Sequence, residues 1–221
     1  MNLLLNALIK YLAGFILMAV LIFVPAGSFS FMNGWLLLAL LFVPMLFLGI
    51  FLYVKAPELL KKRLNAKEKQ SGQKWVVALS GLLFLASFIV AGLDHRFGWT
   101  SIPKIYVGAA AVVLLLSYML YAEVMKENAY LSRTIEVQEG QKVIDTGLYG
   151  IVRHPMYTAT VMLFLCMPVV LGSLFSLMIM LFYPVLIIVR IVQEEKYLEE
   201  HLEGYYEYEL KVRYRLLPHF W

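Results

Sequence analysis

The sequence predicts an all-α polytopic membrane protein with four transmembrane helices, a C-terminal helical hairpin and a cytoplasmic tail. Of its 221 residues 62% are hydrophobic and 15% are charged, against about 45–50% and about 25% in soluble domains. The apolar residues fall in long blocks, and a helix needs about 20 such residues to cross a bilayer. Composition and block length together exclude a soluble globular domain.

Four apolar blocks fill the first half of the chain, at residues 3–24, 35–54, 75–93 and 105–124. Each block is close to the length of one membrane span. Pro44 lies inside the second block and predicts a kink, which helices in lipid tolerate. No charged segment precedes the first block and no clear cleavage site follows it, so we expect a retained span instead of a signal peptide.

The segment between the second and third blocks, residues 55–74, is strongly basic. Its cations are Lys55, Lys61, Lys62, Arg63, Lys67, Lys69 and Lys74, and its acids are Glu58 and Glu68. By the positive-inside rule this loop is cytoplasmic, and so is the N-terminus, because the uncharged loop 25–34 belongs on the other side. We therefore expect residues 1–124 to form a four-span region, with 94–99 as a short outside loop.

Residues 125–221 should form a second region, consisting of a cytoplasmic loop, a helical hairpin and an amphipathic tail. Within the loop, residues 137–144 fit either a short β-hairpin or irregular structure. The apolar run 156–189 would extend about 50 Å as one helix, against a hydrocarbon core of about 30 Å. Gly172-Ser173 near its middle predicts a tight hairpin with both ends on the cytoplasmic side. Each arm is short for a full crossing, which leaves open whether the hairpin reaches the far side.

A compact polar motif, residues 147–157, stands directly before this hairpin. Pro155 biases His154 away from helical geometry and is itself well suited to the first helical position. We therefore expect a helix to begin at Pro155. Its N-terminus would present free N–H groups and a partial positive charge beside Arg153 and His154. The motif thus predicts an anion or ligand site at the membrane surface.

A second polar segment follows the hairpin, from Arg190 into an aromatic and charged tail. Arg190 and Glu194 are one helical turn apart and can pair. Neighbours on a helix differ by about 100° in direction, so Glu194 and Glu195 cannot both face one pocket. We expect Glu194 to be the structural partner of Arg190, and Glu195 to be the freer, ligand-facing carboxylate. Because a hairpin brings its two ends together, the two polar segments should share one site.

Three observations bear on other kinds of site or partner. The only cysteine, Cys166, lies in an apolar run, so an intrachain disulfide and a four-cysteine zinc site are both excluded. His201 stands near several acids, but the spacing matches no metal-binding motif, and we predict no metal site. The net charge of +4 suits a membrane protein with basic loops on one side of the bilayer and does not indicate a nucleic-acid partner.

The pattern Thr146-Gly147-x-Tyr149-x-x-Val152-Arg153-His154-Pro155-x-Tyr157 resembles the signature of the isoprenylcysteine carboxyl methyltransferase family and its phospholipid methyltransferase relatives. So does Glu194-Glu195, followed by Gly204-Tyr205-x-x-Tyr208 and the basic ending 211–218. The resemblance covers about residues 140–221. It implies S-adenosylmethionine as the cofactor, held at the cytoplasmic ends of the last membrane helices.

The resemblance also implies site residues when it is carried over position by position. Lys211 stands where the family often has arginine, and Leu148 where it often has proline. The predicted catalytic residues are Glu194 and Glu195, from the resemblance, and Arg190, from its position one turn before Glu194. The implied cofactor-binding residues are Tyr149, Arg153, His154, Pro155, Tyr157, Glu195, Tyr205, Tyr208 and Lys211.

The chemistry of these residues agrees with the implied cofactor. A helix N-terminus beside Arg153 and His154 suits the carboxylate of S-adenosylmethionine. A glutamate suits its amine or ribose diol, and tyrosines suit its flat base. The expected function is an integral membrane methyltransferase that acts on a lipophilic or small carboxylate, thiol or amine acceptor. A carboxylate or thiolate acceptor needs little general-base help, which agrees with the lack of a recognisable catalytic triad.

Two alternatives remain at this point. The first is a membrane reductase that uses NADPH, because sterol-reductase relatives share a similar C-terminal cofactor region, although in longer chains with more spans. The second is a non-enzymatic scaffold or small transporter. A transporter predicts ionisable residues inside the spans, and the predicted spans here hold almost none.

Overall fold

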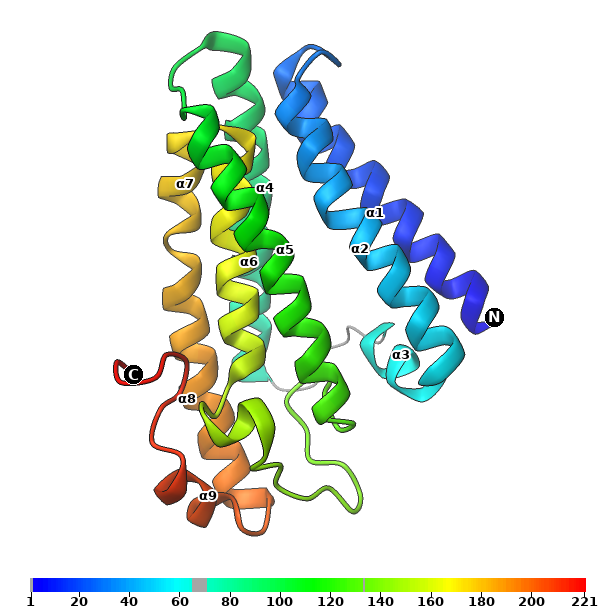
Figure 1. The fold of residues 1–221 in the computed structure, drawn as a ribbon, viewed down its shortest axis with the longest axis vertical. Coiled ribbons are helices and arrows are strands. Elements are labelled where there is room, and N and C mark those ends of the chain that lie inside the picture. The colour runs from blue at the N-terminus through cyan, green and yellow to red at the C-terminus, as the bar shows by residue number, and fades with distance from the viewer. Residues whose placement is uncertain (1, 65–70, 133) are drawn as a thin grey trace.

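The structure is a computed structural model that describes residues 2–64, 71–132 and 134–221. Lys67 and Lys69 of the basic loop lie outside the described residues. The predicted all-α class is confirmed, because the regular structure of the described residues is helical throughout (Figure 1). The helices are α1 (Leu3–Ala26), α2 (Met32–Lys55), α3 (Pro57–Leu64), α4 (Ser71–Phe97), α5 (Lys104–Glu127), η1 (Gly147–Gly150), α6 (Pro155–Leu171), α7 (Leu174–Met180), α8 (Tyr183–His201) and α9 (Tyr205–Lys211).

Five helical segments among the described residues are long and apolar enough to cross a membrane. Four of them contain the predicted spans and correspond to α1, α2, α4 and α5. The fifth, Leu174–His201, joins α7 to α8, whereas α6 with 17 residues is shorter. The expected outside loop 94–99 is partly wrong, since residues 94–97 form the last turn of α4. The helix ends only where Gly98 adopts a left-handed φ of 64°.

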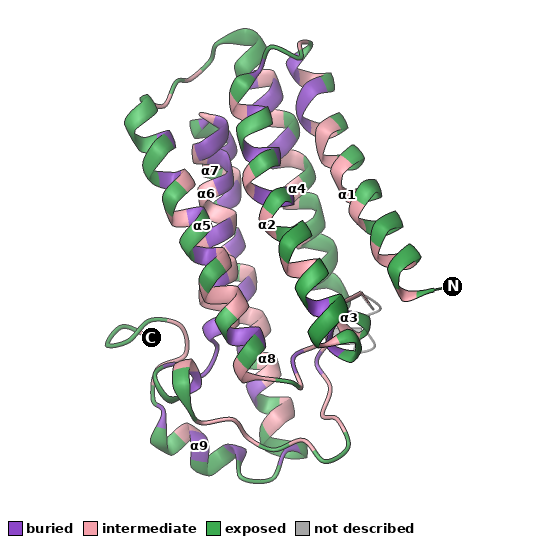
Figure 2. Cartoon of the chain, turned by 45° about the vertical axis from the view of Figure 1, so that its right-hand side comes forward, coloured by how far each residue is buried: buried purple, intermediate pink, exposed green. Residues whose placement is uncertain are grey.

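The helices form two groups that run side by side in Figure 1. α1 and α2 make an antiparallel pair, and α4 to α8 make a bundle in which α6 packs along α5. α1 packs on α4 and joins the two groups. Buried residues concentrate on the facing sides, while the outer face of α1 is largely exposed (Figure 2). α3, α9 and the C-terminal tail gather at one end of the molecule, and we call this the polar end.

The hairpin begins at Pro155, as predicted, and turns where Gly172 adopts a φ of 81°. At its tip the Ser173 hydroxyl donates a hydrogen bond to Asp94, with 2.5 Å between the oxygens. The Leu174 N–H donates to the Thr100 hydroxyl at 3.0 Å. Asp94 lies in the last turn of α4 and Thr100 in the α4–α5 connection, which is at the end of the molecule opposite the polar end (Figure 1). The tip of the hairpin therefore reaches the level of that connection.

Residues 137–144, whose sequence fits either a β-hairpin or a loop, form a loop. Gln138 organises it, because its side-chain amide donates to the Tyr130 carbonyl at 2.6 Å. The Lys62 ammonium of α3 donates to the Gln138 side-chain oxygen at 2.5 Å. The loop is thus attached to α3 and lies across the polar end.

Candidate functional site

The first polar motif begins at a glycine in the left-handed backbone region, which other residues rarely adopt. Gly147 has a φ of 55°, and a Cβ built there would come within 1.9 Å of the Glu127 carboxylate. That carboxylate accepts the Leu148 N–H at 2.9 Å and so fixes the start of η1. The turn buries Tyr149, whose hydroxyl accepts a hydrogen bond from the Asn128 amide at 3.0 Å. The chain is thereby directed toward Arg153 and the start of α6.

The C-terminal tail lies against this motif and accepts hydrogen bonds from two of its backbone N–H groups. The N–H groups of Arg153 and His154 donate to the carbonyls of Tyr214 and Arg215, at 2.8 and 2.9 Å. The His154 carbonyl accepts the N–H groups of the third and fourth residues of α6, and proline at the first position has none. The start of α6 therefore presents fewer free N–H groups to a ligand than the sequence suggested.

Glu195 is the centre of a buried ion cluster that includes Arg153, His154 and Arg215. Its Oε1 accepts from Arg153 Nε and Nη2, both at 2.8 Å, and its Oε2 accepts from Arg215 Nε at 2.7 Å. His154 Nε2 lies 3.1 Å from Oε1 and must carry the proton, because an ionised carboxylate only accepts. The residue is 3% exposed. The expectation that Glu195 is the freer, ligand-facing carboxylate is therefore wrong.

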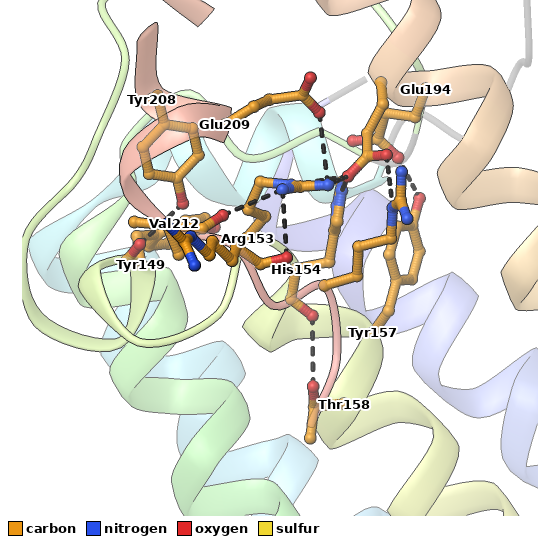
Figure 3. Close-up of polar contacts among 12 residues, drawn as sticks. Tyr149, Arg153, His154, Tyr157, Thr158, Glu194, Tyr208, Glu209 and Val212 are labelled. Carbon is orange, nitrogen blue, oxygen red and sulfur yellow. Dashed lines mark hydrogen bonds and ion pairs between the residues drawn. The ribbon is translucent and has the colours of Figure 1, made fainter. Parts of the chain in front are cut away.

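Glu194 instead belongs to a second cluster that faces a cavity. The Tyr157 hydroxyl donates to Glu194 Oε2 at 2.5 Å, and Arg190 Nε donates to the same hydroxyl at 2.8 Å. Figure 3 shows the side chains of Tyr157 and Glu194 pointing toward each other. Tyr157 thus bridges Arg190 and Glu194, the two residues of α8 that the sequence predicts to pair. All three line the cavity, whereas Glu195 does not.

A further acid lies beside the buried cluster. Glu209 of α9 is 3.4 Å from Arg153, whose Nη1 also donates to the Val212 carbonyl at 2.9 Å. Burial, together with a hydrogen bond to Glu199, raises the pKa of Glu209 to about 7. The cluster therefore connects α6, α8, α9 and the tail through charged side chains that are largely shielded from water.

Two tyrosines of α9 reach the cavity in different ways. The Tyr208 hydroxyl donates to the Tyr149 carbonyl at 2.7 Å and so holds α9 against η1. The Tyr205 hydroxyl is buried and has no hydrogen-bond partner among the described residues. Burial raises the pKa of Tyr205, so the hydroxyl stays protonated and can donate. A buried polar group without a partner costs about 1–3 kcal/mol, so this hydroxyl suggests a ligand that completes the site.

The cavity has a volume of about 820 Å³ and continues from the polar end into the bundle. Eight of the predicted site residues line it: Tyr149, Arg153, His154, Tyr157, Arg190, Glu194, Tyr205 and Tyr208. Pro155 is buried at the start of α6. Lys211 is not among the lining residues, and its ammonium lies 2.6 Å from Asp145 in an exposed pair. A hydrogen bond from that ammonium lowers the pKa of Asp145.

The sequence motifs missed several residues at the polar end. Arg63 of α3, Asn128 at the end of α5 and residues of the loop 130–144 also line the cavity. They come from segments without a motif, so no local signal could identify them. Arg215 belongs to the basic ending of the sequence, but its contact with Glu195 depends on how the tail folds back.

Comparison with known proteins gives one finding on the family. A model of the isoprenylcysteine carboxyl methyltransferase (ICMT) family matches residues 109–200. The matched region begins in α5 and includes η1, α6, α7 and nearly all of α8. No curated protein matches the chain. The resemblance inferred from the motifs is confirmed, and it supports a membrane methyltransferase.

Proposed function

Starting from the match of residues 109–200 to the isoprenylcysteine carboxyl methyltransferase family, we propose that this protein transfers a methyl group from S-adenosylmethionine to a lipophilic or small acceptor. The observation that carries the proposal is a cavity that joins the polar end to an apolar interior. A charged donor molecule and an apolar acceptor could meet there. The basic composition of the α2–α4 connection supports a cytoplasmic location for the polar end.

The residues present fit the proposed methyl donor. The carboxylate of Glu194, held by Tyr157, suits an amine or a ribose diol. The unpartnered hydroxyl of Tyr205 can donate to a further acceptor atom of the ligand, and the rings of Tyr149 and Tyr208 offer flat surfaces to a base. When bound, S-adenosylmethionine supplies an electrophilic methyl group on a sulfonium centre.

The protein's own contribution would be positioning and the exclusion of water. The ion cluster around Glu195 fixes α6, α8 and the tail relative to one another, and this orients the side chains of Tyr157, Arg190 and Glu194. Holding two reacting groups at about 3–3.5 Å in a fixed orientation supplies much of the barrier reduction in such a reaction. A carboxylate or thiolate acceptor is already nucleophilic, so no proton-abstracting residue is needed.

Ligand-induced thermal stabilisation of the purified protein tests this proposal. We expect S-adenosylhomocysteine, the product form of the donor, to raise the melting temperature, and NADPH to leave it unchanged. Stabilisation by NADPH alone would indicate a reductase, and stabilisation by neither would contradict both enzyme functions. Incorporation of a labelled methyl group into membrane extracts would then identify the acceptor.

Tyr205→Phe makes the test specific to the site. Removing the unpartnered hydroxyl should leave the melting temperature of the ligand-free protein unchanged or slightly higher. It should weaken S-adenosylhomocysteine binding by about 0.5–1.5 kcal/mol, or about two- to tenfold in Kd. Tyr206→Phe is the matched control, because Tyr206 is the next residue of α9 and its side chain is 60% exposed. Equal affinities of both variants for S-adenosylhomocysteine would show that the Tyr205 hydroxyl does not contact the ligand.

A further inference from the structure

The apolar part of the cavity is bordered along one side by α2. The lining residues of that helix are Leu41, Phe42, Met45, Leu48, Gly49 and Leu52. Their spacing of three and four residues places them on one face of the helix. Phe47, Ile50 and Phe51 lie on the opposite face and are more than half exposed. The position of Gly49 therefore faces the cavity and not the surroundings of the molecule.

Close packing does not explain Gly49, and the same is true of Gly81 and Gly108, but of these three helical glycines only Gly49 lines the cavity. A Cβ on Gly34, also in α2, would come within 3.0 Å of Ile22. A Cβ on Gly92 would come within 2.6 Å of the Ile22 carbonyl. A Cβ on Gly49 would meet nothing within 4 Å. Glycine inside a helix costs about 0.5–1 kcal/mol relative to alanine, and here no helix contact offsets that cost. What the missing side chain provides is open space inside the cavity.

This open space lies between the two ends of the cavity. On the deep side, the Tyr118 hydroxyl donates to the Leu41 carbonyl at 2.9 Å and the Tyr11 hydroxyl donates to the Phe42 carbonyl at 3.0 Å. These bonds hold the helices together around the inner end. From Leu41 to Gly49 the helix rises about 12 Å, at about 1.5 Å per residue. A large side chain at position 49 would separate this deep part from the polar end, where Arg190 and Glu194 lie.

We propose that Gly49 determines how long an aliphatic chain the methyl acceptor can carry. The inference rests on the proposed function, since it places the reacting group of the acceptor at the polar end and its chain alongside α2. A chain that reaches past Gly49 would lie against the apolar lining of the deep part. Each methylene buried there should tighten binding by about fourfold. A short acceptor would end before Gly49 and would not be affected by a side chain at that position.

The test compares Gly49→Leu with Gly108→Leu, each reconstituted in lipid nanodiscs. Gly108 of α5 is also helical, and a Cβ there also meets nothing within 4 Å, but Gly108 is exposed and does not line the cavity. The two substitutions thus add the same bulk and the same helix propensity. The probes are N-acetyl-S-alkyl-cysteines with chains from ethyl to hexadecyl, and the readout is the melting temperature with each probe. S-adenosylhomocysteine is measured on the same samples.

For the wild type and Gly108→Leu, stabilisation should increase with chain length up to the longest chains that the deep part accommodates. For Gly49→Leu it should stop increasing at a shorter chain, with more than tenfold weaker binding of the longest probes and unchanged binding of the shortest. Gly49→Ala, which adds one methyl group, should show a chain-length limit between those of the wild type and Gly49→Leu. It replaces Gly49→Leu in the test if the leucine variant does not fold.

Three results would overturn the inference: equal length dependence in the Gly49 variants and the wild type, no length dependence in the wild type, or the same loss in Gly108→Leu. The proposed function is judged separately by S-adenosylhomocysteine. If that ligand stabilises the protein but the chains do not, only the role of Gly49 fails. If the chains stabilise in the expected pattern but S-adenosylhomocysteine does not, the aliphatic site stands and the proposed methyl transfer fails.

Discussion

At the scale of single residues, the two adjacent glutamates of α8 have opposite surroundings. Glu195 is buried with Ile191, one turn earlier on the helix, and contacts two guanidinium groups and an imidazole. Glu194 lies about 100° around the helix, faces the cavity and accepts a hydrogen bond from Tyr157. The first is therefore suited to holding the structure together, and the second to contacting a ligand.

Substitution of each acid by glutamine should separate these roles. Glu195→Gln removes the nearest counter-charge of Arg153, which is 7% exposed, and leaves it with Glu209 at 3.4 Å. Breaking a buried ion pair in this way costs about 3–5 kcal/mol, so we expect a large fall in melting temperature in detergent. Glu194→Gln should leave the melting temperature nearly unchanged and reduce the stabilisation by S-adenosylhomocysteine. Glu200→Gln, at an exposed position of the same helix, is the control. A stable Glu195→Gln protein would contradict the structural role.

At the scale of helices, the two groups of the bundle are held together by a close approach of α1 and α4. Gly92 of α4 lies against the backbone of α1, where a Cβ would be 2.6 Å from the Ile22 carbonyl and 2.9 Å from Pro25. Small residues allow membrane helices to approach in this way, and close packing is the main attraction between helices in lipid. Ile22 itself is fully buried in the core that this contact forms.

Gly92→Ala should therefore be destabilising even though alanine favours helices. The added methyl group meets backbone atoms that cannot move aside without separating the two helices, and overpacking of this kind costs about 1–3 kcal/mol. Gly81→Ala, in the same helix, adds a methyl group that meets nothing within 4 Å, and should be neutral or stabilising. The measurement is thermal unfolding of both variants in detergent. Equal stabilities would show that α1 and α4 do not need this contact.

At the scale of the whole molecule, the polar end collects segments that are distant in sequence. α3, the loop 130–144, the start of α6, the end of α8 and the tail all meet there (Figure 1). At the other end, the tip of the hairpin meets the last turn of α4 through the hydrogen bond from Ser173 to Asp94. A membrane that crosses the bundle between these ends would leave the site on one side only.

Cysteine labelling tests this arrangement in a Cys166→Ser background. Ile151→Cys, just before α6, and Glu203→Cys, just after α8, should react with an impermeant maleimide only when it reaches the cytoplasmic face. Ser101→Cys, in the α4–α5 connection, should react only from the other face. All three positions are exposed. Labelling of Ile151→Cys and Glu203→Cys from opposite faces would show that the hairpin does not return to its starting side.

Much of the fold was readable from the sequence, because membrane helices depend on local properties. The length of an apolar block determines whether it can span a bilayer, and the start of α6 followed from the stereochemistry of Pro155. The proximity of the two polar motifs could be predicted because a helical hairpin between them brings its two ends together. Eight predicted site residues do line one cavity for that reason.

Only the tertiary structure decided which acid faces the cavity and which is buried. Helical geometry separated Glu194 from Glu195, but the direction of each depended on contacts with Arg153 and Arg215, which come from other parts of the chain. The surroundings of Gly49 could not be predicted either, because the sequence does not distinguish a glycine that packs against another helix from one that lines a cavity. Spans and helix starts were determined by the sequence because their causes act within a few residues. Burial, charge pairing and the cavity were decided by the fold because their causes act between segments distant in sequence.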